Sequence, residues 1–360
     1  MSLNRGFHPL RIAEVRRETA DAVSICFEIP ETLKETFKFQ AGQHLTLRMD
    51  LDGEDVRRNY SVCVAPSENE IRIAIKQMPA GKFSAWANAQ LREGQVIDVL
   101  PPMGRFVIPE GDGAAPSYVA LAGGSGITPV ISILKTVLET KPGSRFTLLY
   151  GNRDSASIMF IEELAALKNR YIERLEVYHF LEYEAEEIEL FNGRLDRAKC
   201  EEVFSKLVDV SAADAFFICG PGPMMDAAEA ALLARSVSAG RIFIERFTTG
   251  TLSAEQVARN EALQQKAAGT GLVVTLDGRR IRIAFDAGKG NILETVQAAG
   301  LPAPYACKGG VCTTCRAKIL SGTVAMKKNY GLTESEIAQG YVLTCQAVPT
   351  SDEVVLSYDA

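Results

Sequence analysis

The sequence predicts a multidomain protein: an antiparallel β-barrel, then an α/β domain with a parallel sheet, then a smaller α+β domain. Short strand-like runs fill residues 1–110, strands and helices alternate through 111–250, and a hairpin, a helix and a cysteine-rich loop follow residue 271. The length of 360 residues also exceeds what one hydrophobic core normally organises.

The composition is that of an ordinary globular protein, with 47% apolar and 23% charged residues. A net charge of −6 argues against nucleic acid and against an anionic membrane surface as partners. No apolar run approaches the roughly 20 residues that a membrane helix needs. The N-terminus lacks the hydrophobic core of a signal peptide, so a cytoplasmic location is expected.

The first segment, residues 1–110, is rich in β-branched and aromatic residues. Turn signals such as Asp52-Gly53 and Glu93-Gly94 separate its runs, which is typical of an antiparallel barrel. One helix is expected at FSAWANAQL. The expected strands include AVSICFEI, QHLTLRM, YSVCV, EIRIAIKQM, QVIDVL and GRFVI.

The second segment, residues 111–250, alternates buried strands with helices, which indicates a parallel sheet covered on both faces. Its strands are expected at SYVALAG, RFTLLYGNR, LEVYHFL, DAFFICG and RIFIERF, and its helices at ITPVISILKTVLET, SIMFIEELAALKNR, RAKCEEVFSKLV and PMMDAAEAALLA. The acidic run from Glu182 to Glu189 is expected to be a solvated loop.

Residues 251–270 are polar and are interpreted as a partly helical linker. The third segment, residues 271–360, opens with LVVTLDGRRIRIAF, in which Asp277-Gly278 is a strong two-residue hairpin signal. The helix NILETVQAAG, a cysteine loop and closing strands follow.

Four of the eight cysteines form a constellation with a specific spacing: Cys307-x4-Cys312-x2-Cys315, then Cys345. This is the plant-type [2Fe–2S] pattern, in which four thiolates hold two irons. Gly309 lies within the loop, where glycines let backbone N–H groups turn toward the sulfurs. A four-cysteine zinc site and a redox-inert cluster are the alternatives, but zinc sites usually pair two Cys-x2-Cys knuckles. The remaining thiols of Cys26, Cys63 and Cys200 are expected to be packing residues, and the histidines His8, His44 and His179 have no ligand-like spacing.

The segment from Leu272 to Ala360 resembles a plant-type ferredoxin domain over its whole length. The resemblance implies a β-grasp fold, which agrees with the order of hairpin, helix and loop.

Two motifs in the barrel segment are suited to an anionic, planar ligand. One motif lies at the start of an expected strand and reads Arg57-Arg58-Asn59-Tyr60-Ser61. By itself, a basic pair beside a tyrosine is usually only a solvated strand end. Gly81-Lys82-Phe83-Ser84 opens the expected helix, and free N–H groups at a helix N-terminus favour negative charge.

These motifs resemble those of the ferredoxin–NADP reductase family, Arg58-x-Tyr60-Ser61 for the flavin and Gly81-x-x-Ser84 for its pyrophosphate. The resemblance implies that the barrel binds FAD. It implies that Arg58 and Ser84 hold phosphate, that Tyr60 stacks on the isoalloxazine ring and that Ser61 hydrogen-bonds its edge.

Two further turns follow strands of the expected parallel sheet, at the edge where such sheets bind nucleotides. Gly123-Gly124-Ser125-Gly126-Ile127-Thr128-Pro129 departs from the dinucleotide fingerprint, since Pro129 stands where the third glycine belongs. In the family it resembles, GGxGITP is the usual form and the threonine approaches the flavin. Cys219-Gly220-Pro221 resembles the stretch beside the nicotinamide, although a free cysteine is most often a small buried hydrophobe.

Arg153 follows another strand and could contact the 2′-phosphate of NADPH, because guanidinium pairs well with phosphate; a plain surface arginine is an equal alternative. NADPH is therefore the preferred cofactor, with NADH possible. The residues expected to take part in hydride transfer are Tyr60, Ser61, Thr128 and Cys219.

The resemblance to this reductase family implies an enzyme that takes hydride from NAD(P)H into FAD and passes single electrons through the [2Fe–2S] cluster. Within the family, RRNYSVC, FICGPGPMMD and the LPAPYACKGGVCTTC loop most resemble reductases that serve phenylacetyl-CoA epoxidases, which implies a diiron oxygenase as acceptor. Reductases of steroid hydroxylases share the domain order. A stand-alone flavin, dye or iron reductase and a metal-binding adaptor are the alternatives.

Overall fold

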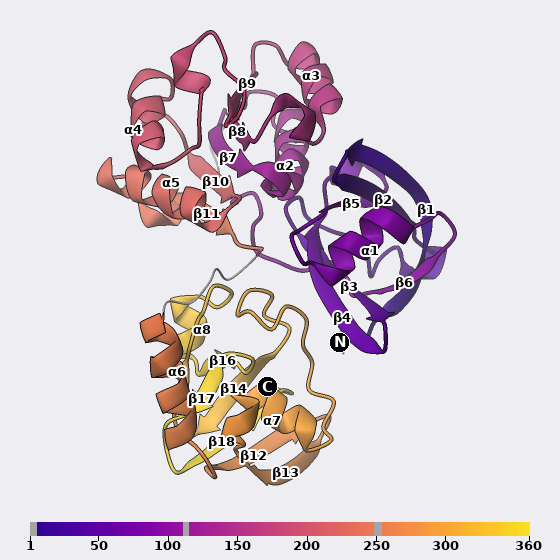
Figure 1. Cartoon of the computed structure of the whole chain (residues 1–360), viewed down its shortest axis with the longest axis vertical. Coiled ribbons are helices and arrows are strands. Elements are labelled where there is room, and N and C mark those ends of the chain that lie inside the picture. The colour runs from indigo at the N-terminus through magenta and orange to yellow at the C-terminus, as the bar shows by residue number, and fades with distance from the viewer. Residues whose placement is uncertain (1–5, 111–114, 248–253) are drawn as a thin grey trace. The chain divides into compact units, whose positions relative to one another are not determined.

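The computed structural model describes residues 6–110, 115–247 and 254–360 (Figure 1). The chain divides into two compact units, Met1–Glu245 and Arg246–Ala360. The first unit contains the antiparallel and the parallel sheet, and the second a mixed sheet. The expected domain limit at 110/111 falls where the described residues end, and the limit at 250/251 falls on residues outside those described.

The first sheet is antiparallel and forms the expected barrel. Its six strands run in the order β4-β3-β6-β1-β2-β5, and an antiparallel bridge between Val62 and Ile73 joins the two ends of that order. Helix α1 (Lys82–Gln90) places Phe83 and Ala87 in the barrel's hydrophobic core. The strands are β1 (His8–Thr19), β2 (Ala22–Glu28), β3 (His44–Leu51), β4 (Glu54–Ser61), β5 (Ile71–Lys76) and β6 (Val96–Val99).

The turn between β3 and β4 is the tight hairpin that the sequence predicts. Asp52 and Gly53 have φ values of 58° and 79°, as a two-residue turn with two left-handed residues requires. In contrast, the prediction of a strand at GRFVI was wrong. Prolines 101 and 102 remove two donors just before it, Gly104 turns away with a φ of 120°, and Phe106 packs edge-on against Phe217 at 5.5 Å.

The second sheet is parallel throughout, in the order β11-β10-β7-β8-β9. Its strands are β7 (Ser117–Gly123), β8 (Arg145–Asn152), β9 (Leu175–Leu181), β10 (Ala215–Cys219) and β11 (Ile242–Glu245). Helices α2 (Ile127–Thr140) and α3 (Ile161–Arg170) pack on one face, and α4 (Arg197–Lys206) and α5 (Gly222–Ala234) on the other. The predicted parallel sheet with helices on both faces is confirmed.

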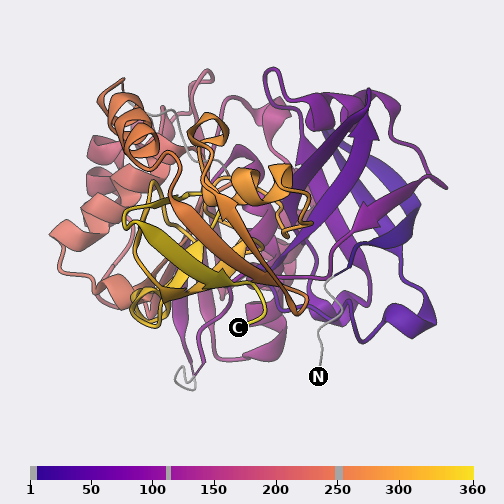
Figure 2. The same ribbon diagram turned by 90° about the horizontal axis from the view of Figure 1, so that it is seen from below.

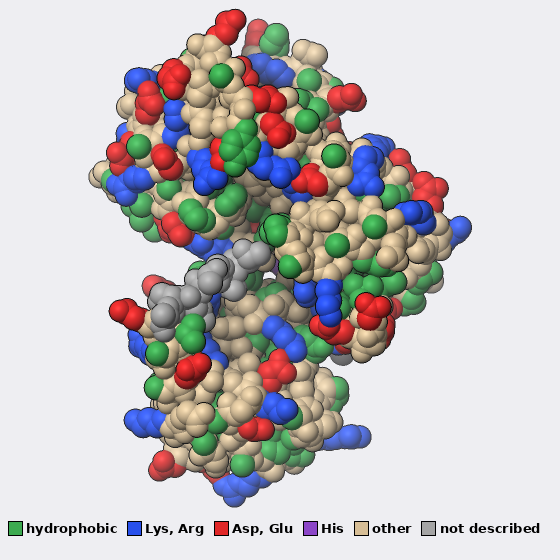
Figure 3. All heavy atoms as spheres, viewed as in Figure 1, with side chains coloured by type: hydrophobic (Ala, Val, Ile, Leu, Met, Phe, Trp, Pro, Cys, Tyr) green, Lys and Arg blue, Asp and Glu red, His purple; other side chains and the backbone are tan. Residues whose placement is uncertain are grey.

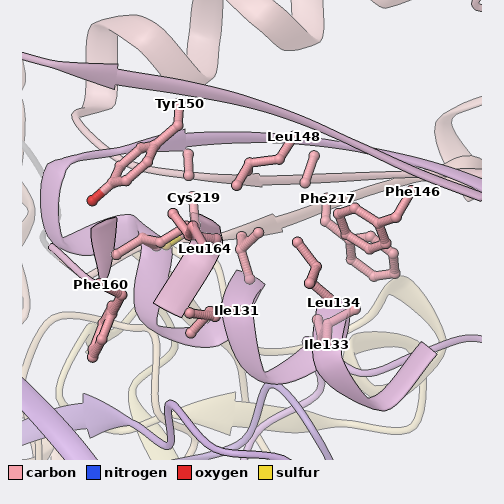
Figure 4. Close-up of a cluster of buried hydrophobic side chains, with 14 of the residues drawn as sticks. Ile131, Ile133, Leu134, Phe146, Leu148, Tyr150, Phe160, Leu164, Phe217 and Cys219 are labelled. Carbon is pink, nitrogen blue, oxygen red and sulfur yellow. The ribbon is translucent and has the colours of Figure 1, made fainter. Parts of the chain in front are cut away.

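Side chains alternate between the two faces along each strand, so they divide between two hydrophobic cores, one on each face of this sheet. On β10, Phe217 and Cys219 face α2 and α3, whereas Phe216 and Ile218 face α4 and α5. Figure 4 shows the first of these cores, with Cys219 and Tyr150 at the carboxyl end of the strands.

The second unit has a five-stranded mixed sheet in the order β13-β12-β18-β14-β16, in which only β12 and β18 run parallel. Strands of this unit are coloured orange to yellow in Figure 2. Asp277 and Gly278 form the predicted hairpin turn with φ values of 51° and 72°. Helix α7 (Ile292–Ala298) packs on the sheet through Ile292 and Val296. This is the arrangement of a β-grasp domain. The sheet's strands are β12 (Gly271–Leu276), β13 (Arg279–Ala284), β14 (Arg316–Ser321), β16 (Tyr341–Leu343) and β18 (Glu353–Ser357); β15 (Val324–Met326) and β17 (Ala347–Pro349) pair separately.

Within the expected linker, residues 254–266 form helix α6 (Ala254–Lys266). Leu263 of this helix and Ala267 just after it pack into the core of the second unit. Helix α8 (Glu334–Ala338) lies beside β16. On the face seen in Figure 3, Lys and Arg side chains are interspersed with Asp and Glu over each unit. No helix among the described residues is long and apolar enough to cross a membrane.

Candidate functional site

The end of β4 carries two of the expected flavin residues. Tyr60 packs against the barrel core with its ring 5.6 Å from that of Phe83, and burial raises the pKa of its hydroxyl. Ser61 is 2% exposed, and its Oγ has no hydrogen-bond partner among the described residues. A buried hydroxyl without a partner is costly. It therefore fits a ligand whose polar edge reaches this point.

His44 lies directly across from Ser61 on β3 and was missed as a site residue. The neighbouring Val62 N–H donates to the Gln43 carbonyl at 2.9 Å, so His44 and Ser61 form the non-hydrogen-bonded type of cross-strand pair, whose side chains lie closest. His44 Nε2 also lacks a partner among the described residues, and burial lowers the pKa of this imidazole to about 4. Only the pairing of two strands reveals the histidine, because its own sequence context carries no signal.

Arg58 and the turn before α1 supply the positive part of the flavin motif. Arg58 is exposed, and its Nη1 donates to the Arg57 carbonyl at 2.7 Å. Ser84 is 5% exposed; its Oγ donates to the Gly81 carbonyl at 3.1 Å and accepts from the Met78 N–H at 3.0 Å. The hydroxyl of Ser84 thus holds the turn together. The N–H groups of the first helical turn are the remaining groups that could bind an anion.

This turn borders an open depression of about 570 Å³ within the first unit. Gly81 and Lys82 line it from the barrel, and Arg153 lines it from the loop that follows β8. Lys82 forms an ion pair with Glu54, so its charge is partly compensated.

The glycine turn after β7 packs tightly on the turn after β10. A Cβ on Gly126 would lie 2.0 Å from the Cys219 carbonyl oxygen, and one on Gly123 would lie 2.6 Å from Cδ of Pro221. Gly124 has a φ of +51°, with open space around its missing side chain. Gly123 and Gly126 therefore allow close packing, while Gly124 permits a left-handed backbone conformation.

The side chains of these two turns are largely enclosed. Thr128 is 2% exposed and its Oγ1 donates to the Ser125 carbonyl at 3.0 Å. Cys219 is fully buried at the end of β10, paired with Ala122 and Glu245 on the strands to either side (Figure 4). Burial, with the charge of Glu245, raises the pKa of the Cys219 thiol well above its usual value. Cys219 is thus a neutral thiol in its resting form.

Arg153 does not extend freely into solvent. Its Nη2 donates to Asp21 Oδ2 at 2.9 Å, a residue 132 positions earlier in the turn between β1 and β2. Burial raises the pKa of Asp21, but the hydroxyl of Thr19 and the cations of Lys76 and Arg153 outweigh burial, so the pKa is lowered overall. Asp21 was not foreseen as a site residue, because this pairing is set by the packing of barrel against parallel sheet.

The four cysteines of the second unit come together as two hydrogen-bonded pairs. Cys312 lowers the pKa of the Cys307 thiol, and Cys315 does the same for Cys345. Backbone N–H groups of Gly309 and Cys312 point at the Cys307 sulfur from 3.3 and 3.4 Å. Each pair thus offers two sulfurs to one iron, which fits a centre of two irons and four thiolates.

The loop that carries these cysteines is held by specific contacts. Lys308, Gly310 and Thr313 have φ values between 50° and 80°, and these left-handed positions turn the backbone inward. The Thr344 hydroxyl donates to the Cys315 carbonyl at 2.9 Å, which ties the residue before Cys345 to the loop. No group of three or more His, Cys, Asp or Glu in the described parts of the chain converges as a site for a single metal ion. The spacing Cys307-x4-Cys312-x2-Cys315 with Cys345 apart, together with the two cysteine pairs, is what fits a binuclear cluster.

Family models match the chain in the order of its domains. The oxidoreductase FAD-binding domain matches residues 9–108, the oxidoreductase NAD-binding domain 120–230, and the 2Fe-2S iron-sulfur cluster binding domain 274–350.

Several relatives match nearly the whole chain. One subunit of the 1,2-phenylacetyl-CoA epoxidase of Escherichia coli (strain K12) is 43% identical over 98% of both chains. The ferredoxin reductase component of the 3-ketosteroid-9-alpha-monooxygenase of Rhodococcus rhodochrous is 33% identical over 97% of this chain and 96% of that protein. Among solved structures, phthalate dioxygenase reductase has the same fold, with a TM-score of 0.60 and 24% identity over 98% of both chains.

Proposed function

Because this chain belongs to the ferredoxin–NADP reductase family, as a reductase with FAD-binding, NAD-binding and [2Fe–2S] domains, we propose that it supplies electrons to a phenylacetyl-CoA epoxidase. The observation that carries the proposal is the 43% identity to one component of such an enzyme over 98% of both chains. The acceptor is then the oxygenase component, which we expect to be a diiron protein.

Bound FAD supplies the chemistry that accepts a hydride from NAD(P)H and releases electrons one at a time to the iron–sulfur cluster. The protein holds these groups in place. We assign the flavin phosphates to Arg58 and to the N–H groups of the first turn of α1, with Ser84 keeping that turn in shape. Tyr60 would pack against the ring, and the unpartnered hydroxyl of Ser61 would be available to the ring's edge.

We assign the nucleotide to the carboxyl end of the parallel sheet. The backbone of Gly123, Gly124 and Gly126 approaches its phosphates, and Gly220 and Pro221 continue that surface. Thr128 and Cys219 would lie near the nicotinamide. As a neutral thiol, Cys219 would add no charge beside the nicotinamide. Arg153 is the candidate for the 2′-phosphate of NADPH.

We further assign the four cysteines, Cys307, Cys312, Cys315 and Cys345, to the cluster. The domain limits proposed for the chain are 1–110, 111–250, a connecting segment at 251–270, and 271–360. A cytoplasmic location belongs to the same proposal, since that compartment keeps thiols reduced.

Reconstitution tests the acceptor. The full-length protein, loaded with FAD and cluster, is combined with the oxygenase components of a phenylacetyl-CoA epoxidase and, separately, of a 3-ketosteroid-9-alpha-monooxygenase. NAD(P)H-dependent product should form with the first set and not with the second. Product with the steroid oxygenase alone would move the assignment to that acceptor.

A control variant separates delivery through the cluster from direct delivery by the flavin. Cys312→Ser should still bleach bound flavin with NAD(P)H but should support no product. Unchanged product formation by this variant would indicate that the flavin delivers electrons directly and that the cluster is not needed.

A further inference from the structure

The ion pair between Arg153 and Asp21 joins two parts of the first unit at the edge of the proposed nucleotide site. Arg153 directly follows β8, at the carboxyl end of the parallel sheet. Its side chain is 55% exposed, and its guanidinium lies 2.9 Å from the Asp21 carboxylate. Both residues line the open depression beside the first turn of α1.

Asp21 is held in position, so its charge does not move away easily. Its Oδ1 accepts from the Thr19 hydroxyl at 2.8 Å and lies 3.7 Å from Lys76 Nζ. Its backbone carbonyl accepts from the Gln77 N–H at 2.7 Å, which fixes the turn itself. The side chain of Asp21 is 29% exposed, which leaves the pair with Arg153 only partly screened by water.

The backbone of Arg153 also contacts the loop that follows β9. The Arg153 carbonyl accepts from the N–H groups of Glu182 and Tyr183 at 3.1 and 2.8 Å, which brings the start of the glutamate-rich loop after β9 against it. Five glutamates lie between positions 182 and 189. Glu182 is paired with Arg194. The cation that a 2′-phosphate would need is thus already occupied by the Asp21 carboxylate.

The two nicotinamide nucleotides differ at this point only by the 2′-phosphate. That group carries negative charge and pairs well with arginine, whereas the ribose hydroxyl of NADH can donate to a carboxylate. We propose that Asp21 competes with the 2′-phosphate for Arg153, and so acts as a specificity-determining residue that lowers the preference for NADPH relative to NADH. The inference rests on the proposed use of this sheet edge by the nucleotide.

The test measures fragment binding to the full-length, FAD-loaded protein. Isothermal titration calorimetry gives the Kd of 2′,5′-ADP, which carries the 2′-phosphate, and of 5′-AMP, which lacks it. In Asp21→Asn the Kd of 2′,5′-ADP should fall by about fivefold, the scale of a half-exposed ion pair, with 5′-AMP unchanged. The ratio of kcat/KM for NADPH over NADH in flavin reduction should rise by a similar factor.

Two further variants make the result specific. Asp98→Asn removes a carboxylate from an equally half-exposed pair, Arg48–Asp98 at 2.7 Å, and should leave both fragments unaffected. In an Arg153→Gln background, Asp21→Asn should no longer change the affinity for 2′,5′-ADP. If Asp21→Asn does not load FAD, Asp21→Ser takes its place in the same comparison.

An equal gain for both fragments in Asp21→Asn would overturn the proposal, because it would indicate a general change in charge. An effect that persists without Arg153, an unchanged Kd for 2′,5′-ADP, or no fragment binding at all would also overturn it. None of these results bears on electron delivery to an oxygenase, which the reconstitution assay measures separately.

Discussion

Replacing Gly126 by alanine should force apart the two turns that meet at the carboxyl end of the parallel sheet. Gly126 has ordinary right-handed backbone angles, φ −62° and ψ −10°, so the substitution adds no backbone strain of its own. The added Cβ would lie 2.0 Å from the Cys219 carbonyl oxygen and 2.8 Å from the Gly220 nitrogen. Because those neighbours are backbone atoms, one turn has to move by about an ångström.

The size of the effect follows from this geometry. Overpacking a close-packed interior costs about 1–3 kcal/mol, and a collision with backbone places Gly126→Ala at about 3 kcal/mol. A displacement of about 1 Å at the nucleotide site lowers the rate of hydride transfer by on the order of a hundredfold. Urea unfolding followed by the fluorescence of Trp86, the single tryptophan, reports on the first unit, and anaerobic flavin bleaching reports on hydride transfer.

Two neighbouring glycines provide matched controls. Gly222 begins α5 with nothing within 4 Å of its missing Cβ, so Gly222→Ala should change stability by less than about 1 kcal/mol. Gly124→Ala meets no atoms but has to adopt a φ of +51°, which costs about 1 kcal/mol. If Gly126→Ala is as stable and as fast as Gly222→Ala, the close packing of the two turns does not exist in solution.

Three other substitutions test separate parts of the site. Ser61→Ala should retain FAD but slow flavin reduction about tenfold, because the hydroxyl aimed at the ring's edge is lost; stopped-flow bleaching measures this, and an unchanged rate would remove Ser61 from the site. Cys312→Ser should abolish the cluster's contribution to the visible absorption and the EPR signal that the cluster gives on reduction. The flavin absorption should stay at full intensity. Burial lowers the pKa of folded His44 to about 4 from an ordinary 6.5. Between those pH values the unfolded chain binds one more proton than the folded chain. The free energy of unfolding therefore falls as the pH drops through that window, by about 3 kcal/mol at pH 4. His44→Asn should flatten this pH dependence of the urea midpoint, and identical pH profiles for both proteins would contradict the burial argument.

The sequence predicted those parts of the fold that depend on short patterns of neighbouring residues. Asp52-Gly53 and Asp277-Gly278 specify tight hairpins by themselves, because both positions of the turn need left-handed residues. The strand expected at GRFVI failed because apolar character was considered without the preceding prolines and without Gly104, which together end the pairing. Phe106 is apolar because it packs against Phe217, not because it lies in a sheet.

The parts of the site that could not be predicted depend on contacts between distant segments. His44 becomes relevant only once β3 and β4 are paired in one register, which puts its ring across from Ser61. Asp21 reaches Arg153 across 132 positions of sequence. Neither residue has neighbours in the chain that distinguish it from an ordinary strand histidine or turn aspartate.

The residues of the glycine- and serine-containing motifs do not all act in the same way, and this decides how their variants should be interpreted. Ser84 uses its hydroxyl to bond the Gly81 carbonyl and the Met78 N–H, and Gly126 makes room for the Cys219 carbonyl. Both shape the backbone whose N–H groups we assign to the phosphates. Substitution at these positions should therefore lower stability and ligand affinity together. Arg58 and Ser61 present side-chain groups instead, so their variants should change ligand binding or hydride transfer while the urea midpoint stays near that of the parent protein.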